Sequence, residues 1–444
     1  MRQVNNSKIM NQDIYSRRRA DLLNQLSTQD IVIVPTSAVK PRNGDVDYIF
    51  RPDSDFYYLC GFAEPEAVLV ISPGRKQGEV VMFCRENDPL REMWDGRRAG
   101  LEGVVDNYGA HDAFPIEDIN DILPGLMEEK EKVFTTVGRY PDFDAQLLAW
   151  VNKIKEDSQR RAKPAPYELV DLNHLLHEMR LFKRQDEIAL MRKAGKMSAA
   201  GHIRAMQSCK PGMYEYQVQA EMECEFRKAG SFYNAYPSIV ASGDNACILH
   251  YTENNCVLND GDLLLIDAGA EYQCYAADIS RTFPVNGKFS AEQRALYDIV
   301  LAAQVSAFEK CQPGCSWNEA HEAAVKVISQ GLLDEGLLKG SLEEVLEKNS
   351  YSQFYMHRTG HWLGMDVHDV GDYQVESQWR ELEPGMVFTV EPGIYVSAES
   401  DTDTRWHNIG IRIEDNILIR KEGYENLTAN APKTVDDIET IMAA

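Results

Sequence analysis

The same short pattern occurs twice in this sequence: a glycine, a mostly apolar run, a carboxylate, one spacer residue and a second glycine. The first copy spans residues 261–269 and ends on Asp267, and the second spans 385–393 and ends on Glu391. Each copy predicts a buried strand that a glycine terminates. Because burial of a lone carboxylate is costly, each acid is expected to have a strong partner. Two copies indicate that two halves of one domain present acids to a shared partner, for which a metal ion is the first candidate.

A second acidic strand follows each copy. If residues 271–274 form a four-residue hairpin loop, Asp267 and Asp278 face each other with Cβ atoms roughly 5 Å apart. Glu414 is expected to face Glu391 in the same manner. Four such carboxylates carry a charge of about −4, which two divalent cations would balance. Oxygen ligands suit Mn²⁺, Fe²⁺, Co²⁺ or Zn²⁺, and these residues do not select among them.

Histidines and a turn motif repeat with the carboxylate strands. His250 precedes the strand that ends on Asp267, and His368 precedes the strand that ends on Glu391. The turn Cys-x-Pro-Gly occurs at 209–212 and again at 311–314, each time between two stretches with a helical pattern. These repeats predict an α+β domain with internal pseudo-twofold symmetry, in which long helices back a curved antiparallel sheet.

Six motifs in order identify a family. They are HYTEN at 250–254, IDAG at 266–269, ADISRTFPVNGKF at 277–289, GHWLGMDVHDVG at 360–371, EPGMVFTVEPG at 383–393 and GIRIEDN at 410–416. Through them nearly the whole chain resembles the pita-bread metallopeptidases of family M24, and within these the bacterial Xaa-Pro aminopeptidase (aminopeptidase P) type. The resemblance implies an N-terminal α/β domain, placed at 1–172, and a catalytic pita-bread domain, placed at 173–444.

The resemblance also implies a set of site residues. The implied metal ligands are Asp267, Asp278, His361, Glu391 and Glu414. They would hold two divalent ions, with Mn²⁺ expected first and Co²⁺, Fe²⁺ or Zn²⁺ as alternatives. Two cations can bridge one water or hydroxide for attack on the carbonyl that follows the first residue of a peptide. The substrate is then a peptide with proline at its second position.

Further residues are expected to assist catalysis or bind substrate. Glu391 is the expected general base. His250 and His368 are expected to flank the metals, and Arg412 is expected to hold a ligand or contact the substrate. The expected substrate contacts are His357, Tyr395, Trp94 and Arg160, of which Trp94 would reach a neighbouring subunit's site in a homo-oligomer. Asp369 and Asp415 are expected to be solvated or to support ligands.

Composition excludes some classes of partner. A net charge of −24 and a pI near 4.9 argue against nucleic acid and anionic membranes as partners. Residues 1–14 lack the apolar core of a signal peptide, and the nine cysteines show no metal-type CxxC pairs. The expectation is a cytoplasmic protein.

Strand patterns at 31–34, 67–71, 79–83 and 132–137 predict the N-terminal α/β domain, and residues 155–168 are expected to form a linker.

Two other functions remain open from the sequence. Prolidase, which cleaves only Xaa-Pro dipeptides, uses the same five ligands. Some pita-bread proteins are non-catalytic peptide binders, but these have typically lost ligands that this chain retains.

Overall fold

The structure is a computed structural model that describes the backbone of residues 6–161 and 164–444 and the side chains of 13–157 and 164–444. The chain divides into two compact units, Met1–His177 and Glu178–Ala444, and the division falls inside helix α7 (Asn173–Leu181). Within the described residues, no helix is both long and apolar enough to cross a membrane.

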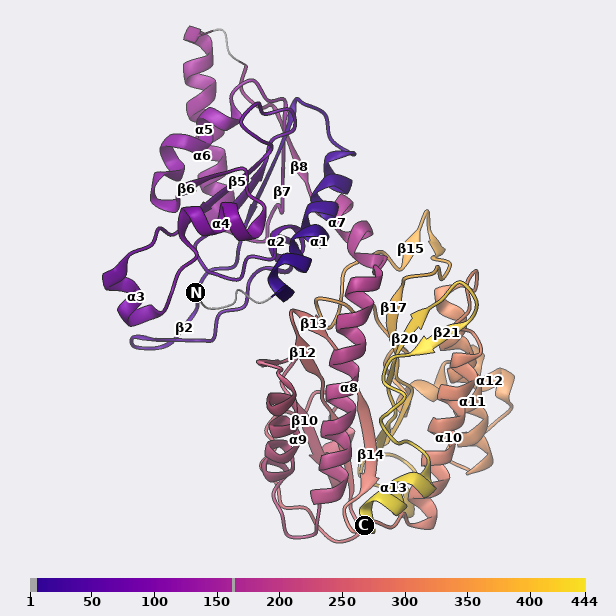
Figure 1. The fold of residues 1–444 in the computed structure, drawn as a ribbon. Coiled ribbons are helices and arrows are strands. Elements are labelled where there is room, and N and C mark those ends of the chain that lie inside the picture. Colours follow the sequence, from indigo (N-terminus) through magenta and orange to yellow (C-terminus); the bar gives the residue numbers. More distant parts are fainter. Residues whose placement is uncertain (1–5, 162–163) are drawn as a thin grey trace. The chain divides into compact units, whose positions relative to one another are not determined.

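The first unit is built on one mixed sheet (Figure 1). Its six strands run in the order β6-β5-β4-β1-β7-β8. Their bounds are β1 Asp30–Pro35, β4 Val68–Ile71, β5 Val80–Cys84, β6 Asp112–Pro115, β7 Lys132–Thr135 and β8 Glu168–Asp171. A small hairpin joins β2 (Pro41–Asn43) to β3 (Val46–Asp47). The central strand β1 is buried along its whole length, as its run of Ile and Val predicts.

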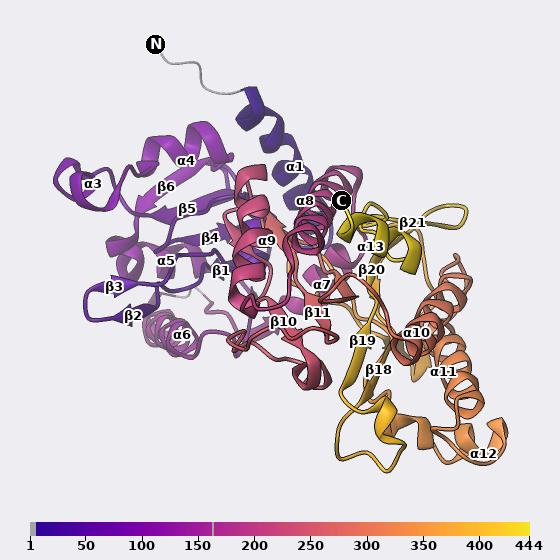
Figure 2. The same ribbon diagram turned by 90° about the horizontal axis from the view of Figure 1, so that it is seen from below.

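Helices cover this sheet and complete an α/β unit (Figures 1 and 2). They are α1 Asn6–Leu23, α2 Ser54–Cys60, α3 Pro89–Asp95, α4 Gly100–Tyr108, α5 Ile119–Met127 and α6 Pro141–Arg161. The expected linker at 155–168 is wrong, because α6 continues to Arg161 and the next described element, β8, belongs to the same sheet. Helix α6 is amphipathic and packs Leu147, Trp150 and Ile154 into the core of the unit. The segment before β8 is held to the same unit, because Glu129 N–H donates to the Pro164 carbonyl and Tyr167 N–H donates to the Glu131 carbonyl.

The second unit has two similar halves. The first half runs through α8 Gln185–Ser208, α9 Glu215–Ala229, β9 Tyr233–Asn234, β10 Ile239–Ser242, β11 Leu263–Asp267, β12 Ala270–Tyr272, β13 Tyr275–Ala276 and β14 Ser280–Pro284. The second half runs through α10 Ala291–Phe308, α11 Trp317–Asp334, α12 Leu342–Glu347, β15 Gln374–Val375, β16 Gln378–Trp379, β17 Val387–Val390, β18 Gly393–Val396, β19 Ile409–Arg412, β20 Asp415–Ile419, β21 Tyr424–Asn426 and α13 Val435–Met442.

Each half backs its antiparallel strands with a helix pair (Figure 2). Helices α8 and α9 pack together, with α9 against β10 and α8 against β12 and β13. Helices α10 and α11 pack together, with α10 against β17, β18 and β19. Helix α10 begins with a capping box, in which Ser290 Oγ accepts from Gln293 N–H and Gln293 Oε1 accepts from Ser290 N–H. Such a cap stabilises a helix start by about 1 kcal/mol.

The Cys-x-Pro-Gly turns show that the halves are related. Gly212, after α8, donates its N–H to the carbonyl of Leu258, and Gly314, after α10, donates its N–H to the carbonyl of Leu382. Leu258 lies five residues before β11, and Leu382 lies five residues before β17. Both glycines adopt φ near +85°, a conformation that glycine accepts readily. The predicted α/β unit followed by a pseudo-twofold pita-bread unit is therefore confirmed.

Candidate metal centre

The two halves of the second unit bring their acids into one cavity of about 790 Å³. The residues lining it include all five expected ligands, Asp267, Asp278, His361, Glu391 and Glu414. Asp278, His361 and Glu414 each place one ligand atom within 4.8 Å of the other two. His361 Nε2 also lies 3.5 Å from Glu391 Oε1. This convergence of one imidazole and several carboxylates is the donor set that first-row divalent metals take in proteins.

The ladder registers explain how these acids meet. In the second half, Val390 pairs with Asp415 and Gly393 pairs with Arg412. Glu391 and Glu414 lie between these two pairs and face each other, as expected. In the first half, the expected register is wrong, because Asp267 pairs with Ser280 rather than with Asp278.

The physical reason for this shift is the turn between β12 and β13. It contains only Gln273 and Cys274, both with positive φ, instead of the expected four-residue loop. The shorter turn moves the pairing by two residues and so leaves Asp278 on the same face of the sheet as Asp267.

Two residues that the sequence did not identify form hydrogen bonds with the candidate ligands. The Tyr236 hydroxyl lies 2.6 Å from Asp267 Oδ1 and also contacts Asp278 Oδ1. Ser280 Oγ donates to Glu414 Oε2 at 2.8 Å. Alternation along the strand could have found Ser280, because it lies two residues after Asp278. No sequence signal distinguishes Tyr236 from the other tyrosines.

Arg412 is buried beside these acids. Its Nη2 donates to Asp267 Oδ2 at 2.7 Å, its Nη1 donates to the Tyr395 hydroxyl at 2.8 Å, and its Nε donates to Ser280 Oγ at 2.8 Å. Arg412 therefore fixes Asp267 directly and Glu414 through Ser280.

The protonation equilibria indicate excess negative charge in the cavity. Burial raises the pKa of Glu391 to about 7, although His361 and Arg412 act in the opposite direction. Burial, with the neighbouring Asp278, raises the pKa of Glu414 well above its usual range. Burial alone would lower the pKa of His361, but its hydrogen bond to Asp278 and the charge of Glu391 raise that pKa to about 9. Divalent cations would relieve this repulsion, so the residues present fit a metal centre.

The other candidate histidines surround the ligands. His250 and His368 line the cavity and are exposed to it, and the His368 ring lies 4.1 Å from the His361 ring between centroids. His357 Nε2 lies 2.9 Å from the Tyr395 hydroxyl, and its Nδ1 lies 3.7 Å from Glu391 Oε2. Burial and the charge of Arg412 lower the pKa of His357 to about 3, so this imidazole is neutral at neutral pH.

Apolar and aromatic side chains form much of the remaining wall. They are Pro237, Ile239, Leu249, Trp317, Val367, Tyr373 and Trp379. Tyr395, expected at the substrate wall, is only 2% exposed and lies behind His357 and Arg412, so its contact with substrate remains a prediction.

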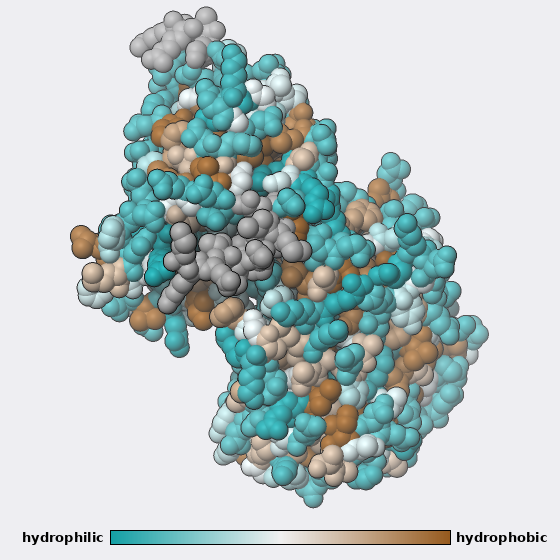
Figure 3. Space-filling model, in the orientation of Figure 1, coloured by the Kyte–Doolittle hydropathy of each residue, from teal (hydrophilic) through white to brown (hydrophobic). Residues whose placement is uncertain are grey.

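The remaining candidates have a different placement. Trp94 lies on α3 and is 85% exposed, together with Leu90 and Met93 on the same helix. Figure 3 shows hydrophobic side chains on the surface at the position of α3. Arg160 falls outside the residues whose side chains the structure describes. Asp369 and Asp415 are both buried, and each contacts two cations.

Comparison with known proteins identifies the same family over both units. Residues 189–421 match the model for metallopeptidase family M24, and residues 15–134 match the model for the aminopeptidase P N-terminal domain. The Xaa-Pro aminopeptidase of Escherichia coli K12 is 43% identical, over 99% of both chains. A solved aminopeptidase from Pseudomonas aeruginosa is 53% identical, covers 97% of this chain and 98% of its own, and superposes with a TM-score of 0.96.

A second solved structure bears on the site. It is a zinc-substituted Escherichia coli aminopeptidase P in complex with product, 42% identical with a TM-score of 0.95, and it covers 97% of this chain and 98% of its own. The chain therefore belongs to metallopeptidase family M24, among the metal-dependent Xaa-Pro aminopeptidases of bacterial type.

Proposed function

We propose that this chain removes the first residue from peptides whose second residue is proline, using two divalent metal ions. The observation that carries the proposal is the convergence of Asp278, His361 and Glu414 within 4.8 Å, in a cavity that Asp267 and Glu391 also line. Because the relatives from Escherichia coli and Haemophilus influenzae are named Xaa-Pro aminopeptidases rather than dipeptidases, hydrolysis of longer peptides is favoured over prolidase activity.

The five ligands would divide between the two halves of the unit. Asp267 and Asp278 come from the first half, and His361, Glu391 and Glu414 come from the second. Two ions bound there, proposed to be Mn²⁺, would supply Lewis-acid charge at the scissile carbonyl and lower the pKa of the attacking water.

Glu391 is proposed to accept the proton that the attacking water releases. Its Oε1 accepts a hydrogen bond from Thr389 Oγ1 at 3.1 Å, which orients the carboxylate towards the cavity. A positioned carboxylate within reach of the nucleophile is the requirement for general-base catalysis.

The surrounding residues are proposed to bind and orient the peptide. His250 and His368 face the cavity with ring N–H groups that can donate to the carbonyl oxygen as its negative charge develops. Arg412 and His357 position Asp267 and Tyr395 through the contacts described above. A prolyl nitrogen in a peptide bond has no N–H to donate, so recognition depends on the shape of the apolar and aromatic wall.

Other assignments are proposed on the same basis. The catalytic domain begins at residue 173, the protein is cytoplasmic, and it forms a homo-oligomer through a surface that includes Trp94. The 85% exposure of this tryptophan supports the last point, because a large aromatic side chain is usually exposed where it contacts a partner.

The test uses chelator-stripped protein reloaded separately with Mn²⁺, Co²⁺ and Zn²⁺. Each form is incubated with Arg-Pro-Pro, Arg-Pro and Met-Ala-Ser, and the products are identified by mass spectrometry. Metal-dependent release of arginine from Arg-Pro-Pro is expected. Cleavage of Arg-Pro alone would instead identify a prolidase, cleavage of Met-Ala-Ser alone a general aminopeptidase, and metal binding without cleavage a non-catalytic binder.

A further inference from the structure

The backbone of Asp278, in the first half, is held by a side chain of the second half. Asn416 lies two residues after Glu414 and is 2% exposed. Its Oδ1 accepts from the Asp278 N–H at 3.1 Å, and its Nδ2 donates to the Asp278 carbonyl at 2.5 Å. One amide group therefore satisfies both backbone groups of Asp278, so the ligand's Cα position depends on a residue from the other half.

Arg281 makes the reverse contact. It lies three residues after Asp278 and is fully buried, and its Nη1 donates to the Glu414 carbonyl at 2.6 Å. All five of its N–H groups have acceptors. These are the carbonyl oxygens of Ser280, Glu414, Ala431 and Pro432, and Asp415 Oδ1. The guanidinium thus ties the first half to the backbone of a ligand in the second half.

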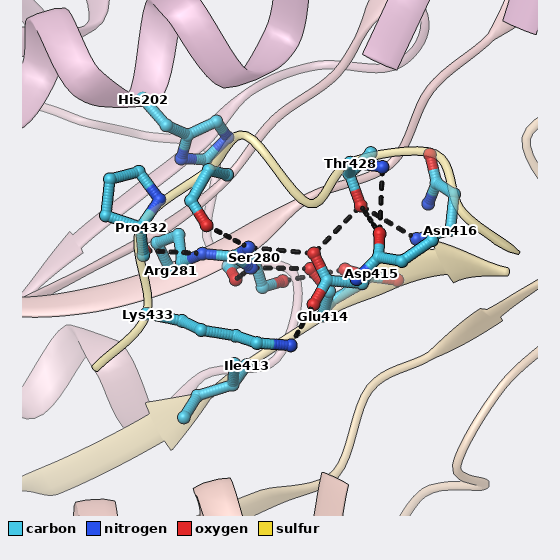
Figure 4. Close-up of polar contacts among 12 residues, drawn as sticks. His202, Ser280, Arg281, Ile413, Glu414, Asp415, Asn416, Thr428, Pro432 and Lys433 are labelled. Carbon is cyan, nitrogen blue, oxygen red and sulfur yellow. Dashed lines mark hydrogen bonds and ion pairs between the residues drawn. The ribbon is translucent and has the colours of Figure 1, made fainter. Parts of the chain in front are cut away.

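Asp415 holds the guanidinium in this position (Figure 4). Its Oδ1 accepts from Arg281 Nη2 at 2.8 Å, and its Oδ2 accepts from Lys433 Nζ at 2.6 Å. Asp415 is fully buried and forms ion pairs with both Arg281 and Lys433. Arg281 therefore contacts the backbone of Glu414, whereas the Glu414 side chain lines the cavity.

We propose that Arg281, Asp415 and Asn416 form a crossed clasp whose role is to set the spacing of the metal ligands contributed by the two halves. The inference rests on the proposed metal ligation by Asp278 and Glu414. Each arm of the crossed clasp holds the backbone of a ligand in the opposite half rather than its carboxylate. Displacing either arm therefore moves a ligand relative to its counterpart without removing any ligand atom. These three are positioning residues, because none of them reaches the cavity.

These buried contacts could instead stabilise only the fold. Variants of Asn416, compared with a control variant, separate stabilisation of the fold from positioning of the metal ligands. Asn416→Ala removes both hydrogen bonds to Asp278, and Asn416→Ser retains a single hydrogen-bonding group. Asp55→Asn is the control, because Asp55 is also a fully buried carboxylate, and Arg139 Nη1 donates to it at 2.7 Å. Asp55 lies in the first unit, remote in sequence from every candidate ligand.

The measurement is a calorimetric titration of Mn²⁺ into chelator-stripped full-length protein, with thermal unfolding of the metal-free protein alongside. Asn416→Ala is expected to raise the Kd for Mn²⁺ by about 10- to 100-fold, with a smaller rise for Asn416→Ser. Asp55→Asn is expected to lower the unfolding midpoint and leave the Kd unchanged.

The crossed clasp is refuted if Asn416→Ser, the variant expected to fold most readily, binds Mn²⁺ with the wild-type Kd and stoichiometry. It is equally refuted if Asp55→Asn weakens Mn²⁺ binding by the same factor as the Asn416 variants. A wild-type protein that binds no Mn²⁺, Co²⁺ or Zn²⁺ would overturn the proposed function itself, so the two failures are distinguishable.

Discussion

Replacing Glu215 with glutamine is expected to destabilise the protein and impair the loop that carries His250. Glu215 is the first residue of α9, is fully buried and accepts five hydrogen bonds. Its Oε1 accepts from Ser242 N–H, Ser242 Oγ and Asn245 Nδ2, and its Oε2 accepts from the Tyr251 hydroxyl and Cys256 N–H. These donors lie just before the loop 243–256, within it and at its last residue, so one carboxylate holds the loop along its whole length.

The magnitude follows from which donors lose their acceptor. Each Glu215 oxygen accepts from one backbone N–H, Ser242 at Oε1 and Cys256 at Oε2. Either orientation of a glutamine amide therefore points its NH₂ at a backbone N–H, which is buried at Ser242 and partly buried at Cys256. An unsatisfied buried donor costs about 1–3 kcal/mol, and the remaining bonds lose the contribution of a charged acceptor. We expect a loss of about 3 kcal/mol, which lowers the unfolding midpoint by about 6–12 °C in a unit of this size.

The assay combines thermal unfolding with steady-state kinetics on Arg-Pro-Pro. Because the loop carries His250, kcat/KM is expected to fall by about 10-fold or more, while the Kd for Mn²⁺ stays unchanged. Glu221→Gln is the matched control on the same helix, since Glu221 is 42% exposed and pairs with Arg204 at 2.6 Å. A surface pair of this kind contributes about 1 kcal/mol at most. The reasoning fails if Glu215→Gln unfolds within about 1 kcal/mol of wild type, or if Glu221→Gln costs as much.

Three further predictions concern the metal, pH and assembly. Asp278→Asn is expected to abolish turnover in metal-supplemented, folded protein, and retained activity in that variant would argue against the two-metal assignment. Burial lowers the pKa of His202 from 6.5 to about 4. As the pH falls, this histidine therefore binds a proton at a higher pH in the unfolded chain than in the folded protein. Stability from this group is complete above about pH 6.5 and decreases as pH falls towards 4, by about 2 kcal/mol between pH 7 and 5. Urea unfolding of wild type and His202→Gln at both pH values checks this, and equal pH dependence in the two proteins would contradict it. Trp94→Ala is expected to shift the protein towards monomer in analytical ultracentrifugation, and an unchanged sedimentation coefficient would remove α3 from the interface.

Local patterns in the sequence were sufficient to predict two strands of the second unit and the acids at their ends. The repeated run of glycine, apolar residues, acid and glycine predicts β11 and β17 together with Asp267 and Glu391, because burial and termination of a strand are encoded within a few residues. The two Cys-x-Pro-Gly turns predict the related halves for the same reason. The strand patterns led to the four carboxylates Asp267, Asp278, Glu391 and Glu414, whereas His361 was added as a ligand only by the resemblance of whole motifs to a family.

Tertiary structure decided register, burial and contacts between the halves. The two-residue turn at Gln273 places Ser280 rather than Asp278 opposite Asp267, since either loop length fits the same pattern of apolar residues. From the sequence, Asp415 could be either a solvated acid or an acid that supports a metal ligand. Packing between the halves buries it against Arg281.

Tyr236 contacts two acids from a segment with no motif, and only the structure shows that Trp94 is exposed. Such contacts join residues far apart in the chain. A sequence therefore determines which residues can bind or catalyse, and the folded chain determines which of them meet, because meeting depends on the packing of many elements at once.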